Sequence, residues 1–182
     1  MKHTMKVLVT GGAGFIGSNF VRYALKQHPN WQITTLDALT YAGRRETLHD
    51  VIDHPRHAFV HGNITDATVV EPLVQDADIV VHFAAETHVD RSIQSAESFI
   101  QTDVIGTFVL LEAARLNTAL QRFVQISTDE VYGSVTTGKS RETDALMPRN
   151  PYAASKAAAD RLAYSYWATY GVPVIVTRAS NN

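Results

Sequence analysis

Two residues four positions apart, Tyr152 and Lys156, are the first whose types and spacing could do chemistry. They stand in an alanine-rich stretch that favours a helix, where positions i and i+4 share one face. An ammonium group beside a phenol favours the phenolate and so lowers the pKa of the phenol. Such a tyrosine could take a proton from an alcohol near neutral pH. Because a Tyr and a Lys at this spacing are common without such a role, the interpretation needs a cofactor site elsewhere in the chain.

A second group of candidate residues is the run Thr128-Asp129-Glu130, which follows a short apolar segment. The threonine hydroxyl can hydrogen-bond a reacting oxygen. Two neighbouring carboxyls push their pKa values apart, so that one can serve as an acid and the other as a base. An enzyme that eliminates water needs such a pair, whereas a pure redox enzyme does not. The alternative is a helix N-terminus, where a capping residue and acids in the first turn are favoured by the helix dipole.

The cofactor site is indicated by a glycine-rich turn near the N-terminus. Gly11, Gly14 and Gly17 satisfy the pattern G-x-x-G-x-x-G. With Gly12 in the first place, the turn also satisfies G-x-G-x-x-G. The turn follows a β-branched run and precedes a helical pattern. In that context glycines allow a tight turn and let the backbone approach a pyrophosphate at the helix N-terminus. We therefore predict a dinucleotide site here.

Asp37 lies about 20 residues after the glycine turn, at the end of the next apolar run. A carboxylate in this position can accept hydrogen bonds from the ribose hydroxyls of adenosine and repels a 2′-phosphate, which favours NAD over NADP. Arg44 and Arg45 would favour NADP if either reached that phosphate, but we interpret them as part of a solvated loop. A surface Asp in a fold that binds no nucleotide is the remaining alternative.

The elements that would position these residues alternate along the chain as apolar runs and helical patterns. This alternation predicts right-handed βαβ units and an α/β fold, a Rossmann-type doubly wound parallel sheet with helices on both faces. Ligands of such sheets bind at the carboxyl ends of the strands. We expect a loop over Gly133–Asn150, strands at Met5–Thr10, Gln32–Leu36, Ala58–His61, Asp78–Phe83, Arg122–Ser127 and Val174–Thr177, and helices at Phe15–Gln27, from the cap Asp66 to about Val74, at Ser95–Asn117 and at Tyr152–Tyr170.

Composition excludes several classes of function. The 182 residues are 45% hydrophobic and 19% charged, which is typical of one soluble globular domain. With 16 basic and 18 acidic residues, the net charge of −2 argues against nucleic-acid and anionic-membrane binding. No apolar run reaches the length of a membrane span. The absence of cysteine excludes disulfides and cysteine chemistry, and favours a reducing, cytoplasmic setting. The eight histidines, His82 and His88 included, form no ligand cluster, so no metal site is predicted.

The motifs together resemble those of the extended short-chain dehydrogenase/reductase superfamily and, within it, the dTDP-glucose 4,6-dehydratases. The resemblance covers nearly the whole chain. Its most specific part is the Thr-Asp-Glu triplet, because related nucleotide-sugar epimerases share the glycine turn and the Tyr-x-x-x-Lys pair but usually lack adjacent acids. The matching segments are Val9–Ser18, Asp37–Gly43 (DALTYAG), His82–Ile93 (HFAAETHVDRSI), Ile126–Gly133 (ISTDEVYG), Tyr152–Asp160 and Arg178–Asn182 (RASNN).

The resemblance implies a reaction on dTDP-glucose with NAD as cofactor: oxidation at C4, elimination of water across C5–C6 and return of hydride to C6. Tyr152, assisted by Lys156 and Thr128, would remove the proton of the C4 hydroxyl. Glu130 would remove the proton at C5, and Asp129 would protonate the departing C6 hydroxyl. The alternative is an NAD-dependent epimerase or dehydratase of another nucleotide sugar. A dinucleotide-binding module without catalysis is a further alternative.

The same resemblance assigns binding residues. Asn63 stands where the family usually has Asp, and Asp103 stands where Asn is common. Substrate contacts are implied for Thr87, Thr128 and Asn181. The implied cofactor contacts are Gly11, Gly14, Phe15, Ile16, Gly17, Asp37, Ala38, Leu39, Thr40, Asn63, Ile64, Phe83, Ala84, Ala85, Thr102, Tyr152, Lys156 and Asn182.

Two expectations concern the whole molecule. Residues 1–182 would form an NAD-binding domain, and the C-terminal portion that in the family binds the nucleotide of the substrate would be absent, because the chain stops just after a strand. Family members are usually homodimers, paired through two helices of each subunit. Here those helices would be Ser95–Asn117 and Tyr152–Tyr170.

Overall fold

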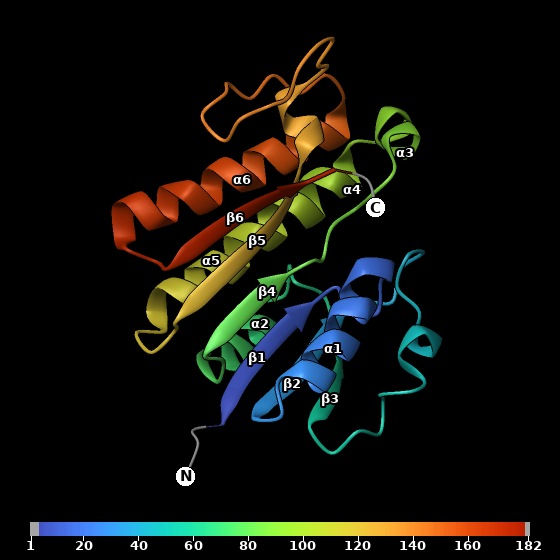
Figure 1. Cartoon of the computed structure of the whole chain (residues 1–182), viewed down its shortest axis with the longest axis vertical. Helices are drawn as coiled ribbons and strands as arrows, with labels where there is room; N and C mark the ends of the chain where they lie inside the picture. Colours follow the sequence, from blue (N-terminus) through green and yellow to red (C-terminus); the bar gives the residue numbers. More distant parts are fainter. Residues whose placement is uncertain (1–3, 181–182) are drawn as a thin grey trace.

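The computed structural model describes residues 4–180, which are built around one sheet of six parallel strands (Figure 1). The strand order is β3-β2-β1-β4-β5-β6. The predicted Rossmann-type fold is confirmed, and each predicted strand is present with its ends moved by at most two residues. The strands are β1 (Met5–Thr10), β2 (Trp31–Asp37), β3 (His57–His61), β4 (Ile79–His82), β5 (Arg122–Thr128) and β6 (Val174–Ala179).

Side-chain caps in the local sequence mark the start of two helices, α2 and α6. Asp66 caps α2, accepting a hydrogen bond of 3.0 Å from the backbone N–H of Thr68. Asn150 caps α6, whose first residue is a proline, and α6 ends at Gly171 with a φ of +73°. The helices are α1 (Phe15–Gln27), α2 (Ala67–Gln75), α3 (Val89–Gln94), α4 (Glu97–Phe99), α5 (Thr107–Leu116) and α6 (Pro151–Tyr170), with short turns η1 (Arg45–Leu48) and η3 (Asp129–Tyr132).

The predicted continuous α-helix over Ser95–Asn117 is wrong in its first half. Ser95 is extended, and the helix starts at Glu97. After α4 the chain runs through a seven-residue π-helical segment, η2 (Ile100–Gly106), before α5 continues in α geometry. Such π segments are rare and are frequent at functional sites. The wider turn places Asp103 in the protein interior, 2% exposed.

One face of the sheet is covered along its length, whereas the other is covered only in part, because Ile175 of the edge strand β6 is 46% exposed. On one face Leu8, Val80 and Phe123 pack with α2, α5 and α6, which lie behind the sheet in Figure 1. On the other, Val7, Val9 and Ile33 pack under α1 and η1. The carboxyl ends of β1 and β4 lie side by side, with Thr10 paired opposite His82, although β2 and β3 come between the two strands in the chain. Among the described residues, no helix has the length and apolarity needed to cross a membrane.

Candidate active site

A cavity of about 370 Å³ opens at the carboxyl ends of β1, β4 and β5, where the strand order reverses. Ligand sites of open parallel sheets form at such a reversal. The structure brings most of the predicted cofactor residues together in its wall. Those that line it are Gly11, Gly14, Phe15, Ile16, Gly17, Asp37, Ala38, Thr40, Asn63, Ile64, Phe83, Ala84, Ala85, Thr102 and Lys156, with the predicted substrate residue Thr87.

The glycine turn forms one side of the cavity, and the structure decides between its two patterns. Gly11 has a φ of +69°, and a Cβ there would lie 2.5 Å from the backbone N of Ala84. A Cβ on Gly17 would lie 2.3 Å from the carbonyl oxygen of Gly11. Gly12 instead packs against Thr35 of β2, away from the cavity. The residues Gly11, Gly14 and Gly17 are therefore the ones that shape the site.

Asp37 lies in the wall of the cavity and is 7% exposed. One carboxylate oxygen accepts a hydrogen bond of 2.8 Å from the N–H of Ala13 in the glycine turn. The other accepts one of 2.8 Å from the N–H of Leu39, which has a φ of +52°. Leu39 itself does not line the cavity. Asp37 thus holds the two loops of the predicted ribose site at a fixed separation.

The wall of the cavity fits a polar, phosphate-bearing ligand. Its glycine turn leads into α1, whose first turn carries no acidic residue and no side-chain cap, so backbone N–H groups face the turn. Two buried polar atoms of the wall have no partner within residues 4–180: the hydroxyl of Ser127 and the Oε2 of Glu86. Buried polar atoms are normally hydrogen-bonded, so these two are open to a ligand.

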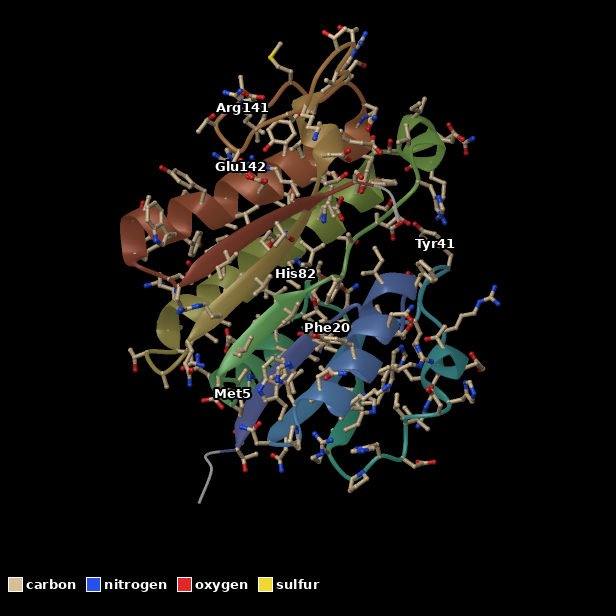
Figure 2. All side chains as sticks on the ribbon, viewed as in Figure 1. Met5, Phe20, Tyr41, His82, Arg141 and Glu142 are labelled. Carbon is tan, nitrogen blue, oxygen red and sulfur yellow. The ribbon has the colours of Figure 1, made fainter. Side chains whose placement is uncertain are left out.

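A bridge crosses the rim of the cavity between the loops that follow β2 and β4. The Tyr41 hydroxyl donates to the Thr87 carbonyl at 2.9 Å and lies at the same distance from the Thr87 N–H. The Arg91 guanidinium lies over the Tyr41 ring, 3.5 Å from its centre. Figure 2 labels Tyr41 in the loop that follows β2. The bridge holds Thr87 at the cavity wall, and its role as a substrate contact stays a prediction.

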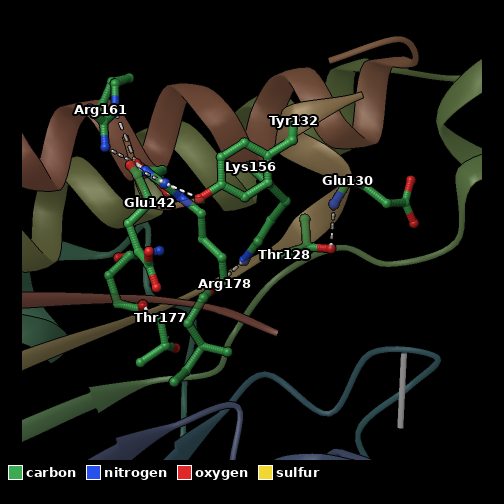
Figure 3. Close-up of polar contacts among 11 residues, drawn as sticks. Thr128, Glu130, Tyr132, Glu142, Lys156, Arg161, Thr177 and Arg178 are labelled. Atoms are coloured by element: carbon green, nitrogen blue, oxygen red, sulfur yellow. Dashed lines mark hydrogen bonds and ion pairs between the residues drawn. The ribbon is translucent and has the colours of Figure 1, made fainter. Parts of the chain in front are cut away.

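The Tyr152–Lys156 pair departs from the simple expectation. Lys156 is buried, and its Nζ donates a hydrogen bond of 2.7 Å to the Ile126 carbonyl (Figure 3). Burial raises the pKa of Tyr152, and the charge of Glu130 raises it further, whereas a hydrogen bond with Thr128 lowers it. The expected net lowering of the phenol pKa is therefore not found. Desolvation outweighs any effect of the ammonium group, which is held against β5.

The Thr-Asp-Glu run forms the η3 turn at the end of β5. Thr128 caps it, accepting a hydrogen bond of 3.3 Å from the N–H of Glu130. The Oε2 of Glu130 accepts one of 3.3 Å from the Asn150 side chain, which also caps α6. Asp129 is exposed. The helix N-terminus interpretation of this run is confirmed, because the residues start a helical turn. The same turn holds the Glu130 carboxylate at the cap of the helix that carries Tyr152, and the acid–base role of the two carboxyls stays a prediction. These three residues do not line the main cavity.

Beneath the cavity, His82 occupies a fully buried position at the end of β4, near the centre of Figure 2. The Thr107 hydroxyl donates to the carbonyl of Asp103 at 2.5 Å, so it accepts from the Nε2–H of His82 at 3.0 Å. The Nδ1 then accepts from the Thr10 hydroxyl at 2.7 Å. The network fixes a neutral histidine, and burial lowers its pKa to about 3.

We expect His82 to make the protein sensitive to acid. The folded pKa lies below the ordinary value of 6.5, so this contribution to stability is complete above pH 6.5 and is lost as the pH falls toward 3. Between pH 6.5 and 5 the loss is about 2 kcal/mol. Urea unfolding at a series of pH values measures it. His82→Gln, which lacks the titration, serves as the control; an equal pH slope in this variant would contradict the assignment. His57, whose pKa burial also lowers, contributes to both proteins alike.

Several residues of the site were missed by sequence reasoning. Ser127 and Tyr41 lie inside the quoted motifs, so their positions were a usable signal. Asn150 precedes the proline that opens α6, as a capping residue often does. The other cavity residues that were not predicted are Leu36, Ala42, Gly43, Gly62, Glu86, His88 and Ile126. The predicted contacts Asn181 and Asn182 lie outside the described residues. Within 4–180, no three His, Asp or Glu side chains gather as a metal site would require.

A parallel sheet with a glycine turn at its reversal point and a Tyr–Lys pair beside the cavity defines a Rossmann-type α/β protein. A sequence profile of the GDP-mannose 4,6 dehydratase family matches residues 8–182. The chain belongs to this family.

Three similar proteins illustrate the relationship. The chain is 58% identical over 178 residues to the low-salt glycan biosynthesis protein Agl12 of Haloferax volcanii, covering 98% of this chain and 57% of that protein. It matches the crystal structure of DesIV, the dTDP-glucose 4,6-dehydratase of Streptomyces venezuelae with NAD and TYD bound, with a TM-score of 0.92 and 49% identity over 96% of this chain and 55% of the other. A UDP-glucose 4-epimerase of Brucella ovis in complex with NAD matches with a TM-score of 0.86 and 29% identity, over 97% and 52%. The chain spans little more than half the length of these proteins.

Proposed function

We propose that this chain carries the NAD-binding and catalytic half of an enzyme that converts dTDP-glucose to its 4-keto-6-deoxy product. The observation that carries the proposal is the pair of carboxyls at the end of β5. Asn150 bonds to Glu130 and also caps the helix that presents Tyr152. An acid, a base and a phenol that lie near one another beside the cavity suit oxidation combined with loss of water.

The cavity is proposed to hold NAD, with the glycine turn at the pyrophosphate, Asp37 at the adenosine ribose, and Lys156 and Ser127 toward the nicotinamide end. When bound, the nicotinamide would accept and return a hydride. The similarity to NAD-bound structures supports this choice.

The remaining chemistry belongs to side chains of this chain. Tyr152, with Thr128 as its hydrogen-bond partner, takes the proton of the C4 hydroxyl. The resulting ketone acidifies the C5 proton, which Glu130 removes. Asp129 donates a proton to the C6 hydroxyl, which then leaves as water. The exposure of Asp129 suits a residue that must be reprotonated in each turnover.

The main alternative is epimerisation or dehydration of another nucleotide sugar. The structural similarity to an epimerase and the high sequence identity to Agl12 both support this alternative. Asp129 and Glu130 discriminate between the two reactions, because inversion at C4 requires no proton abstraction at C5.

The test measures product formation and exchange of the C5 hydrogen with solvent deuterium. This chain, and the same chain joined to the C-terminal half of a dehydratase relative, are incubated with NAD and dTDP-glucose. The 4-keto product is followed by its absorbance in alkali. We expect Glu130→Gln to lower product formation and C5 exchange about 10²–10⁴-fold. Glu71→Gln, the same change at an exposed position of α2, is the control and should have no effect.

Two outcomes would redirect the proposal. NAD binding without product in either protein would favour a different nucleotide sugar. Product formation that survives Glu130→Gln would exclude elimination through this carboxylate.

The proposed assembly is a cytoplasmic homodimer that buries the outer faces of η2, α5 and α6. Large apolar side chains are exposed there, and such patches are typical of interfaces. Sedimentation of the purified chain would measure this. The exposed residues are Ile105, Phe108, Tyr164 and Trp167.

A further inference from the structure

Asp103 is a buried carboxylate next to the site, and the proposed mechanism does not use it. It lies in the π-helical segment η2 and is 2% exposed. Its Oδ1 accepts a hydrogen bond of 2.8 Å from the N–H of Glu86, in the loop that lines the cavity. Its Oδ2 accepts one of 2.6 Å from the hydroxyl of Ser155, on the helix between Tyr152 and Lys156. One side chain therefore joins the cofactor loop to the catalytic helix.

Titratable groups from α6, from the loop after β4 and from β4 itself surround Asp103. From α6, Lys156 attracts it and Tyr152 responds to its charge. From the loop after β4, the Glu86 carboxylate repels it. From β4, His82 stays neutral and is linked to the backbone carbonyl of Asp103 through Thr107. Burial raises the pKa of Asp103 to about 6, with Glu86 acting in the same direction and Lys156 against it.

The hydrogen bonds around Asp103 can form whether its carboxyl group is ionised or protonated. The Ser155 hydroxyl has one hydrogen but two acceptors, Asp103 Oδ2 and, at 2.8 Å, the carbonyl of Tyr152. When Asp103 is ionised, the two acceptors compete for that hydrogen. A protonated Asp103, or an amide in its place, donates to Ser155 and leaves the hydroxyl free to donate to Tyr152. An Asn therefore keeps every contact and removes only the charge.

We propose that Asp103 is a positioning residue for the Tyr152–Lys156 pair, which locks the catalytic helix to the cofactor loop and sets the electrostatic potential at both groups. Its negative charge favours the ammonium form of Lys156 and disfavours the phenolate of Tyr152. The proposal concerns the site of the proposed function, but it is measured without substrate or cofactor.

The experiment uses the whole chain labelled with ¹³Cζ-tyrosine and follows the titration of each ring by NMR. Tyr152→Phe identifies the Tyr152 signal by its disappearance. We expect Asp103→Asn to move the Tyr152 titration to lower pH. Asp53→Asn, the same change at an exposed acid outside the cavity wall, should leave it in place. Asp103→Ala, which also removes the contacts with Ser155 and Glu86, should lower the unfolding temperature more than Asp103→Asn does.

A second measurement needs no variant. In the unaltered protein, the Tyr152 signal should show an inflection near pH 6 as Asp103 titrates. An unshifted Tyr152 titration in Asp103→Asn overturns the proposal, and so does the absence of that inflection. Because neither readout involves turnover, a failure of the dehydratase assay leaves this test intact.

Discussion

Replacement of Tyr152 by Phe is expected to lower turnover about 10²–10⁴-fold, the range for loss of a general base. Phenylalanine keeps the ring, which packs edge-on against Phe99 with the ring centres 6.3 Å apart. The fold should therefore be preserved. Tyr152 does not line the main cavity, so the affinity for NAD should change little. Steady-state assay of the 4-keto product and a calorimetric titration with NAD measure the two effects separately.

Tyr23→Phe is the control for this prediction. It removes a phenolic hydroxyl at a position of α1 that is 59% exposed and lies outside the cavity wall and the proposed dimer faces. Its activity should equal that of the unaltered protein. Comparable losses in the two variants would mean that the effect of Tyr152→Phe does not come from proton transfer.

Asp160→Ala is expected to lower the free energy of unfolding by about 3–5 kcal/mol, which is typical when one partner of a buried ion pair is removed. Asp160 is fully buried on α6 and accepts hydrogen bonds of 2.7 and 3.0 Å from Arg178 of β6 (Figure 3). The side chain of Arg178 is only 12% exposed. Without the carboxylate, the hydrogen-bond partners left to this guanidinium within residues 4–180 are the Tyr132 hydroxyl and the Glu142 carbonyl. Urea unfolding at neutral pH measures the loss.

The control for Asp160 is an ion pair on the surface. Lys6 and Asp76 are 2.5 Å apart, but their side chains are 48% and 70% exposed. Asp76→Ala should cost at most about 1 kcal/mol, because water screens such pairs. Equal losses for the two variants would show that Arg178 relaxes into solvent when its partner is removed.

The fold class, the strands and most of the cavity wall could be predicted because they depend on local signals. The local conformation is specified by the sequence itself at the glycine turn between a strand and a helix. The same holds for the acid after the second strand. The partners of buried side chains could not be predicted in this way. The contact of Lys156 with the Ile126 carbonyl joins two elements that are distant in the chain, and its strength depends on burial that no local pattern reports.

The π-helical segment η2 is a second feature that local sequence patterns could not predict, here in the backbone conformation. The apolar spacing of residues 95–117 is compatible with a regular helix, which is what the sequence predicted. What widens the turn is tertiary: Asp103 bonds to the cofactor loop and to Ser155 of α6. The pKa of Tyr152 likewise follows from desolvation, which required the folded structure.

The pairing of β1 with β4, in which Val7 lies opposite Ile79, has a consequence for how the chain is made. During synthesis β1, α1, β2 and β3 leave the ribosome well before β4. Until β4 emerges, the backbone N–H and C=O groups along one edge of β1 have no strand to pair with. Pairing across such a long separation is slow. The cavity lies at the carboxyl ends of these two strands, so it is complete only after β1 and β4 have paired. A dinucleotide bound there would slow the separation of β1 from β4 during unfolding. It would leave the rate at which the two strands first pair during folding unchanged.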